Sequence, residues 1–308
     1  MPIAITARVR SVHADRPQGT ALRVVPILGV SQTEPDYRLL NSDTLPKVQI
    51  TEVSEGGSVP TLLVKNGLDT RLFLIDGQEL VGAKQNRILN TDVLVPPQAE
   101  LKIPVSCVEQ SRWNYRGRAF APGKSASHSV RMSKQASVLR ELKSGGGHSS
   151  DQGAVWAGVR HCLAESACAS PTAALHDAYV QRDKEFASFR SELKLPADAV
   201  GLAVFHGSKL RGIDVFDRAS TLESFWSTLL DSYAMDFLGQ PPDVQAQPAE
   251  ADLAQINSAL TRSAEAKWES FNPPGEGKDY RMADDALSGS ALVWDERVVV
   301  HLQLFPRV

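Results

Sequence analysis

The segment 76–87 concentrates side chains that can bind or position a charged small molecule. Its sequence is Asp76-Gly-Gln-Glu-Leu-Val-Gly-Ala-Lys-Gln-Asn-Arg87. Lys84 and Arg87 can meet anionic oxygens, and the Arg87 guanidinium can do so as a two-pronged fork. Gln85 and Asn86 add amide donors and acceptors. We therefore expect these four side chains to bind a ligand.

Two acids in the same segment are candidates for proton transfer. Asp76 and Glu79 could each act as a general base, a general acid or a metal ligand. Gly77 and Gly82 flank Glu79 and let the backbone turn tightly and approach a ligand closely. The segment lies between two apolar runs, which predicts a hairpin that carries the polar groups.

The segment 103–115 is the second candidate, and its sequence is IPVSCVEQSRWNY. In a regular strand Val105, Cys107 and Glu109 share one face of the sheet. Glu109 is a third candidate for the general base. Cys107 is a possible nucleophile if a neighbouring cation lowers its pKa, but a free cysteine is more often a small buried apolar residue.

The end of this second segment adds a cation and two aromatic rings. Arg112 could bind an anionic ligand or form an ordinary ion pair with Glu109. Trp113 and Tyr115 could stack on a base or a sugar, and Trp113 is the ligand-binding candidate of the two. Packing is the commoner use of such rings.

The stretch 112–143 is locally basic. It holds eight Lys or Arg residues against one acid, Glu141, in a chain with a net charge of -3. A flap of this charge could attract a phosphate, a protein partner or a nucleic acid. A solvated loop and helix face would give the same pattern. The aromatic residues are not interleaved with the basic ones, so nucleic acid is not the favoured partner.

These segments must be positioned by a strand-rich N-terminal region. The pattern predicts short strands with tight turns through residue 115, which favours an antiparallel sheet or a sandwich over βαβ units. It then predicts a loop, a helical middle section and a return to strands. The fold class expected is therefore α+β. The expected strands are 20–30, 47–53, 60–65, 71–75, 79–83, 87–95, 99–108, 199–205, 209–215, 265–270, 278–283, 289–294 and 297–304. The expected helices are 131–143, one opening at 149–151, 170–193, 219–238 and 251–262, with a loop at 116–130 and a linker at 240–249.

Composition and motifs exclude several classes of site. The 308 residues are 42% apolar and 22% charged, as in ordinary globular proteins. The three cysteines show neither a disulfide framework nor zinc-ligand spacing, so we expect a cytoplasmic protein without a cysteine-ligated zinc site. The sequence identifies no other metal site. No apolar run is long enough to span a membrane. Phosphate-loop, dinucleotide-binding, zinc-hydrolase and serine-hydrolase motifs are absent. The sequence identifies no cofactor.

The polar string 76–87 resembles that of the ARPP-1 family, together with 103–109 and Arg112-Trp113. This domain is associated with ADP-ribosylglycohydrolases and rhodanese-phosphatases. The resemblance covers most of the chain and implies one unit over 1–308. A subdivision into a β-rich region (1–115), a basic loop with helices (116–195) and an α/β region (196–308) is possible. The family's associations imply a role near ADP-ribose or other NAD-derived or phosphorylated compounds.

Two hypotheses follow. In the first, the chain binds or hydrolyses an anionic, nucleotide-like small molecule, and Lys84, Arg87 and Glu109 converge on one site. In the second, the polar string is a structural network within a non-catalytic module that binds a protein or a nucleic acid through 112–143. The second hypothesis predicts satisfied buried ion pairs. The sequence leaves open whether the chain is an enzyme.

Overall fold

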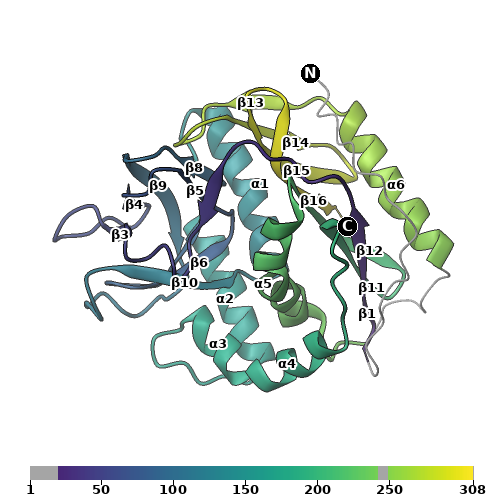
Figure 1. Cartoon of the computed structure of the whole chain (residues 1–308). Coiled ribbons are helices and arrows are strands. Elements are labelled where there is room, and N and C mark those ends of the chain that lie inside the picture. Colours follow the sequence, from purple (N-terminus) through teal and green to yellow (C-terminus); the bar gives the residue numbers. More distant parts are fainter. Residues whose placement is uncertain (1–19, 242–248, 308) are drawn as a thin grey trace. The chain divides into compact units, whose positions relative to one another are not determined.

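The computed structural model describes residues 20–241 and 249–307, which form two compact units (Figure 1). The sheet unit comprises the described residues through Glu34, Lys184–Phe271 and the segment from Lys278 onward. The barrel unit comprises Pro35–Asp183 and Asn272–Gly277. Each unit therefore combines segments that are distant in the sequence, and the expected β-rich region over 1–115 is divided between them.

The sheet unit contains one antiparallel sheet with three helices. Its strand order is β1-β11-β12-β16-β15-β14-β13. All eight residues of β11 are buried, because this strand lies inside the sheet and α5 packs against it. The strands are β1 (Leu22–Leu28), β11 (Ala199–His206), β12 (Lys209–Phe216), β13 (Glu269–Phe271), β14 (Lys278–Ala283), β15 (Leu287–Trp294) and β16 (Val298–Pro306). The helices are α4 (Asp183–Ser191), whose first residue belongs to the barrel unit, α5 (Ala219–Phe237) and α6 (Ala249–Glu265).

The barrel unit is built on a six-stranded antiparallel sheet in the order β10-β6-β7-β9-β4-β3. An antiparallel bridge between Thr51 of β3 and Ala119, next to β10, joins the two edges of this sheet. The sheet therefore closes on itself as a small barrel, which removes its open edges. Its strands are β3 (Val48–Glu52), β4 (Thr61–Asn66), β6 (Gln78–Gly82), β7 (Arg87–Leu89), β9 (Glu100–Cys107) and β10 (Phe120–Ser125).

A second small sheet and three helices complete the barrel unit. The sheet has the order β2-β5-β8, and β2 runs parallel to β5. Its strands are β2 (Tyr37–Leu39), β5 (Arg71–Leu74) and β8 (Val93–Val95), and the helices are α1 (His128–Ser144), α2 (Gln152–Glu165) and α3 (Leu175–Gln181). The Asp151 side chain accepts a hydrogen bond from the Ala154 amide and caps α2, which confirms the expected start of that helix.

Alternation along the barrel strands determines which side chains fill its interior. On β3, Val48, Ile50 and Glu52 are buried, and Gln49 between them is exposed. Apolar residues from all the barrel strands form one core, including Leu62, Leu80, Leu89, Ile103, Val105 and Phe120. A charged residue at an inward position, such as Glu52, is therefore the exception to this pattern.

The α+β class is confirmed, with strands toward both ends of the described chain and helices in its middle. The single strand expected over 87–95 is wrong. It is two strands, β7 and β8, in different sheets, because Asn90 and Asp92 use their side chains to hold the segment between them. Asn90 donates to the carbonyl of His148 at 3.0 Å, and Asp92 accepts from the amide of Asp76 at 2.7 Å.

Two further expectations about the helical middle are corrected. The loop expected over 116–130 contains β10 and the start of α1, because Phe120 and Ser125 pair with β6. The single helix expected over 170–193 is α3 followed by α4, with Arg182 between them outside regular helix geometry. The expected linker 240–249 lies mostly outside the described residues.

Candidate functional site

The two candidate segments lie side by side at one end of the barrel. Leu80 of β6 pairs with Arg87 of β7, and Arg87 pairs with Cys107 of β9. Gly82 adopts a φ of 140°, and a Cβ there would lie 2.6 Å from the carbonyl oxygen of Ala119. Only glycine fits this conformation and spacing, which lets β10 approach the turn between β6 and β7.

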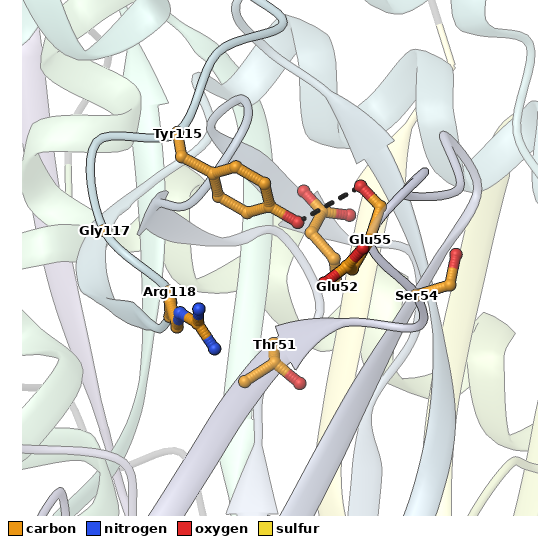
Figure 2. Close-up of a pocket in the computed structure, with 7 residues that line it drawn as sticks. All are labelled: Thr51, Glu52, Ser54, Glu55, Tyr115, Gly117 and Arg118. Carbon is orange, nitrogen blue, oxygen red and sulfur yellow. Dashed lines mark hydrogen bonds between the residues drawn. The ribbon is translucent and has the colours of Figure 1, made fainter.

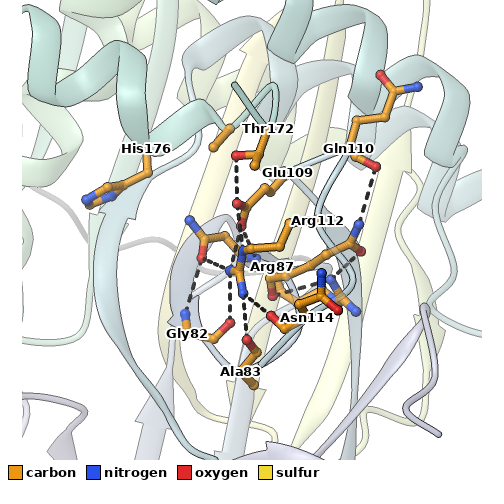
Figure 3. Close-up of polar contacts among 12 residues, drawn as sticks. Gly82, Ala83, Arg87, Glu109, Gln110, Arg112, Asn114, Thr172 and His176 are labelled. Carbon is orange, nitrogen blue, oxygen red and sulfur yellow. Dashed lines mark hydrogen bonds and ion pairs between the residues drawn. The ribbon is translucent and has the colours of Figure 1, made fainter. Parts of the chain in front are cut away.

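Glu109 is the centre of a buried hydrogen-bond network (Figure 3). Arg112 donates to its two oxygens through Nε at 2.7 Å and Nη2 at 2.6 Å. The Asn86 amide donates at 3.0 Å, and the Thr172 hydroxyl donates at 2.8 Å. Arg112 also donates to the carbonyls of Gly82, Ala83 and Asn114 and to the Asn86 side chain. This arrangement ties the β6–β7 turn to the end of β9.

The electrostatics of Glu109 follow from that network. Burial on its own raises the pKa of this carboxyl, and the hydrogen bonds from Arg112, Thr172 and Asn86 outweigh it. Its pKa therefore lies below the ordinary value, and Glu109 is a carboxylate at neutral pH. A carboxylate with this many donors is a poor general base, because its lone pairs are already occupied.

Asp76 and Glu79 lie in two other polar contacts. Asp76 forms a buried ion pair with Lys134 of α1. Glu79 accepts from Nδ1 of His176 at 3.0 Å. That hydrogen bond raises the pKa of His176 above its ordinary value, and burial of the ring opposes the increase. The three catalytic candidates therefore pair with three different partners and do not form one constellation.

Arg87 points into the barrel, as its pairing with Cys107 requires. Its Nη1 donates to the side-chain oxygen of Gln85 at 2.9 Å. Its Nη2 lies 3.9 Å from Oε1 of Glu52, a residue that the sequence analysis did not single out. Burial lowers the pKa of Arg87, which nevertheless stays protonated because arginine does not deprotonate in proteins.

Lys84 and the rings of Trp113 and Tyr115 lie next to the buried pair of Arg87 and Glu52. The Lys84 ammonium donates to the carbonyl of Gly56 at 2.9 Å. It lies 5.2 Å from the centre of the Trp113 ring and 5.1 Å from that of Tyr115, at cation–π distance. The Arg87 guanidinium lies 5.4 Å from the Trp113 ring. Lys84, Arg87 and Trp113 therefore lie together, and Glu109 is linked to them through Asn86 and Gln85.

Cys107 lies inside the barrel and is fully buried. Burial raises its pKa to about 11, and the nearby Arg87 charge reduces the increase only in part. The thiol is therefore protonated at neutral pH, so the low-pKa nucleophile interpretation lacks its physical basis. The apolar interpretation fits the structure.

A cavity of ≈ 640 Å³ opens beside this end of the barrel (Figure 2). Tyr115 and Arg118 stand on one side of it, and Glu52, Ser54 and Glu55 stand on the other. The Tyr115 hydroxyl donates to the carbonyl of Glu55 at 3.4 Å. The volume lies within the range of small-molecule sites, about 300–1,000 Å³.

The basic stretch 112–143 does not form one charged surface. Arg112, Arg131 and Lys134 are buried, and Arg112 and Lys134 pair with carboxylates. The remaining basic side chains are exposed or half-buried, at 116, 118, 124, 140 and 143. Binding of a protein or a nucleic acid by this stretch stays a prediction.

Two residues at or near these contacts, Glu52 and His176, were not among the candidates predicted from the sequence. Glu52 was available from the alternation Val48, Ile50, Glu52, which places an acid on the buried face of its strand. His176 carried no comparable signal, because its position depends on the packing of α3. Arg118 was included only as one member of the basic stretch 112–143.

Neither a metal cluster nor a membrane-crossing helix is found within residues 20–241 and 249–307. No group of three or more His, Cys, Asp and Glu side chains there could hold a metal ion. Within the same ranges, each helix is too short or too polar to cross a membrane.

Comparison with known proteins identifies a family and nothing closer. Neither the curated proteins nor the solved structures include a match. One family model, described as the ARG and Rhodanese-Phosphatase-superfamily-associated Protein domain, matches residues 11–305. The match covers nearly the whole chain, and the protein therefore belongs to the ARPP-1 family.

Proposed function

We propose that the cavity at the end of the barrel binds an anionic, nucleotide-like small molecule. The class we have in mind includes ADP-ribose and other NAD-derived or phosphorylated compounds. The observation that carries the proposal is the wall of the cavity, which combines the cation of Arg118, the ring of Tyr115 and the carboxyl groups of Glu52 and Glu55. Such a wall offers a partner for a phosphate, for a flat ring and for sugar hydroxyls.

Each component of this wall is suited to one portion of a nucleotide. Arg118 is exposed, so its guanidinium is accessible to pair with a phosphate in a bidentate manner. Tyr115 is 49% exposed, and an exposed ring can stack on a base. The neighbouring Lys84 ammonium strengthens the positive potential on this side. The family name adds an association with ADP-ribose-related proteins, which supports the ligand class.

The more specific form of the proposal is that the protein hydrolyses the ligand bound in this cavity. Asp76, Glu79 and Glu109 are engaged with Lys134, His176 and Arg112, so they are not placed to act on a ligand in the cavity. In a hydrolytic reaction the acid–base role would fall to Glu55, the exposed carboxyl group of the wall. Product formation from ADP-ribose or NAD, followed by chromatography, would test this step directly.

A thermal-shift screen with ADP-ribose, NAD, AMP and ribose 5-phosphate tests binding. A ligand at 100 times its Kd stabilises the folded state by about 2.7 kcal/mol, which raises the melting temperature. Arg118→Gln should weaken binding about 10- to 100-fold, because a charge-assisted hydrogen bond contributes about 1.5–3 kcal/mol. The matched control is Arg116→Gln, which changes an exposed arginine two residues away that does not line the cavity.

Two outcomes would overturn the proposal. One is a screen in which none of the four compounds raises the melting temperature at millimolar concentration. The other is a hit whose affinity is the same for the wild type and for Arg118→Gln, since the ligand would then bind elsewhere.

A further inference from the structure

Glu52 is an acid whose side chain points into the barrel, and its carboxylate oxygens accept no hydrogen bond from the described residues. Its side chain is 3% exposed, and that of Arg87 is fully buried. Their closest oxygen and nitrogen are 3.9 Å apart, which is too far for a hydrogen bond. Among the described residues, neither oxygen of Glu52 has a hydrogen-bond partner.

Buried polar groups in folded proteins are almost always hydrogen-bonded, so each exception needs an explanation. Arg87 shows the same feature, because its Nε and Nη2 also lack partners among the described residues. Charge balance explains why Glu52 and Arg87 lie close together. It does not explain why both carboxylate oxygens lack donors, and a ligand that brings donors would explain it.

The composition of the cavity wall determines which donors fit. Besides Glu52, the wall carries Glu55, the hydroxyl groups of Thr51 and Ser54, and Arg118 as its one cation among the described residues. A phosphate next to Glu52 would meet a like charge and is disfavoured there. A pair of neighbouring hydroxyl groups can donate to both oxygens of one carboxylate, as acidic side chains do for ribose in other nucleotide sites.

The cover over Glu52 is thin. A Cβ at Gly57, where φ is 76°, would lie 3.3 Å from Oε2 of Glu52 and 3.1 Å from the Trp113 ring. Trp113 is 41% exposed. Glycine at 57 therefore lets the loop between β3 and β4 lie directly over the carboxylate. Binding of a ligand to Glu52 requires this loop or Trp113 to move aside, because both oxygens of the carboxylate are buried.

We infer that Glu52 recognises a vicinal diol, and that the site takes a ribose with its two hydroxyls on Glu52 and its phosphate toward Arg118. The inference rests on the proposed function and fixes the orientation of the ligand within the cavity. The cation of Arg87 balances the negative charge of Glu52, and a charged carboxylate is the form that accepts from two hydroxyls.

Calorimetric titration with AMP and with 2′,3′-dideoxy-AMP tests the inference. The wild type should bind AMP at least about tenfold more tightly, because a site built for hydroxyl groups rejects the analogue that lacks them. Glu52→Gln should bring the affinity ratio close to one. Arg118→Gln should weaken both ligands by the same factor and leave the ratio unchanged. Glu100→Gln is the control, since it removes an exposed acid from the same barrel.

The wild-type comparison decides the matter even if Glu52→Gln fails to fold. Equal affinity of the wild type for the two ligands overturns the inference and leaves the proposed function standing. A wild type that binds AMP weakly or not at all also overturns it, whereas the proposed function fails only if the whole screen is negative or if Arg118→Gln leaves the affinity of the hit unchanged. A selectivity for AMP that persists in folded Glu52→Gln places the diol elsewhere and equally overturns the inference.

Discussion

Glu109→Gln is the substitution that best separates a structural role of the Glu109 network from a catalytic one. Glutamine has nearly the same shape, but it removes the negative charge and replaces one accepting oxygen with an amide that only donates. Arg112 would then be a buried cation without its carboxylate. The Asn86 amide or the Thr172 hydroxyl would face a donor instead of an acceptor.

The structure gives an approximate magnitude. Breaking a buried ion pair by removing one partner costs about 3–5 kcal/mol. Glu109 is fully buried and Arg112 is 6% exposed, so solvent screening reduces this cost little. Arg112 keeps its hydrogen bonds to the carbonyls of Ala83 and Asn114, and we therefore expect the lower end, about 3 kcal/mol. At roughly 2–4 °C per kcal/mol, the melting temperature should fall by about 6–12 °C.

Thermal and urea unfolding of Glu109→Gln, Arg112→Met and the double variant measure this effect. The double variant should be less destabilised than the sum of the single variants by at least about 1 kcal/mol, since residues in one network couple. Glu100→Gln, an exposed change on β9, should stay within about 0.5 kcal/mol of the wild type. Strict additivity, or a Glu109→Gln protein as stable as the wild type, would refute the network as a source of stability.

The pH dependence gives an independent check. The pKa of Glu109 is lowered in the folded state, so its stabilising effect is complete above the unfolded value of about 4.3 and is lost as the pH falls through the folded value. The stability difference between the wild type and Glu109→Gln should therefore be constant from about pH 6 to 8 and shrink below about pH 4. A difference that stays constant into acid would contradict the assignment.

Three further predictions concern neighbouring contacts. The Glu79 hydrogen bond raises the pKa of His176, so this contact stabilises the fold below pH about 6.5 and loses its effect as the pH rises through the folded value. The melting temperature of the wild type should therefore exceed that of His176→Gln by more at pH 6 than at pH 8. A difference that is the same at both pH values would count against a stabilising role of this contact. Iodoacetamide at pH 8 should modify the half-buried Cys168 before the fully buried Cys107, and peptide mass spectrometry measures the order. Faster modification of Cys107 would support its role as a nucleophile. Gly123→Ala should destabilise the protein by about 1–3 kcal/mol in urea unfolding, because its Cβ would fall 2.5 Å from Oε2 of Glu79, and wild-type stability would show that β10 adapts freely.

The sequence predicts the local elements of this fold better than their long-range arrangement. Alternation located most strands, including β3 and β9, because the side-chain period of two is a property of a few consecutive residues. The closure of the barrel depends on Thr51 meeting Ala119, which are far apart in the chain, and no local pattern encodes that contact. The division of 87–95 into β7 and β8 has the same origin, since it depends on partners of Asn90 and Asp92 elsewhere in the unit.

The same limit applies to the candidate site. The sequence singles out the polar string 76–87 and the segment 103–115, and the structure places them side by side. Residue types alone do not reveal the partner of each charge. Asp76 and Glu109 are paired with cations of α1 and of the loop after β9, and Glu79 is hydrogen-bonded to His176 of α3. A carboxylate that the sequence presents as a catalytic candidate can therefore be paired with a buried side chain of the fold.

The distribution of these charges favours a binding site over a purely structural barrel. If the polar residues served only to hold the barrel together, each buried acid next to a cation should also accept hydrogen bonds. Glu109 does so, because Arg112 donates to both of its oxygens. Glu52 is the exception, since it lies 3.9 Å from Arg87 and accepts from no described residue while it lines a cavity. An inward acid without donors lowers stability, and a barrel built for stability alone would carry an apolar residue there, as at Val48 and Ile50. The position of Glu52 beside the cavity is the reason to search for a ligand there, ahead of the more conspicuous charges of the string 76–87.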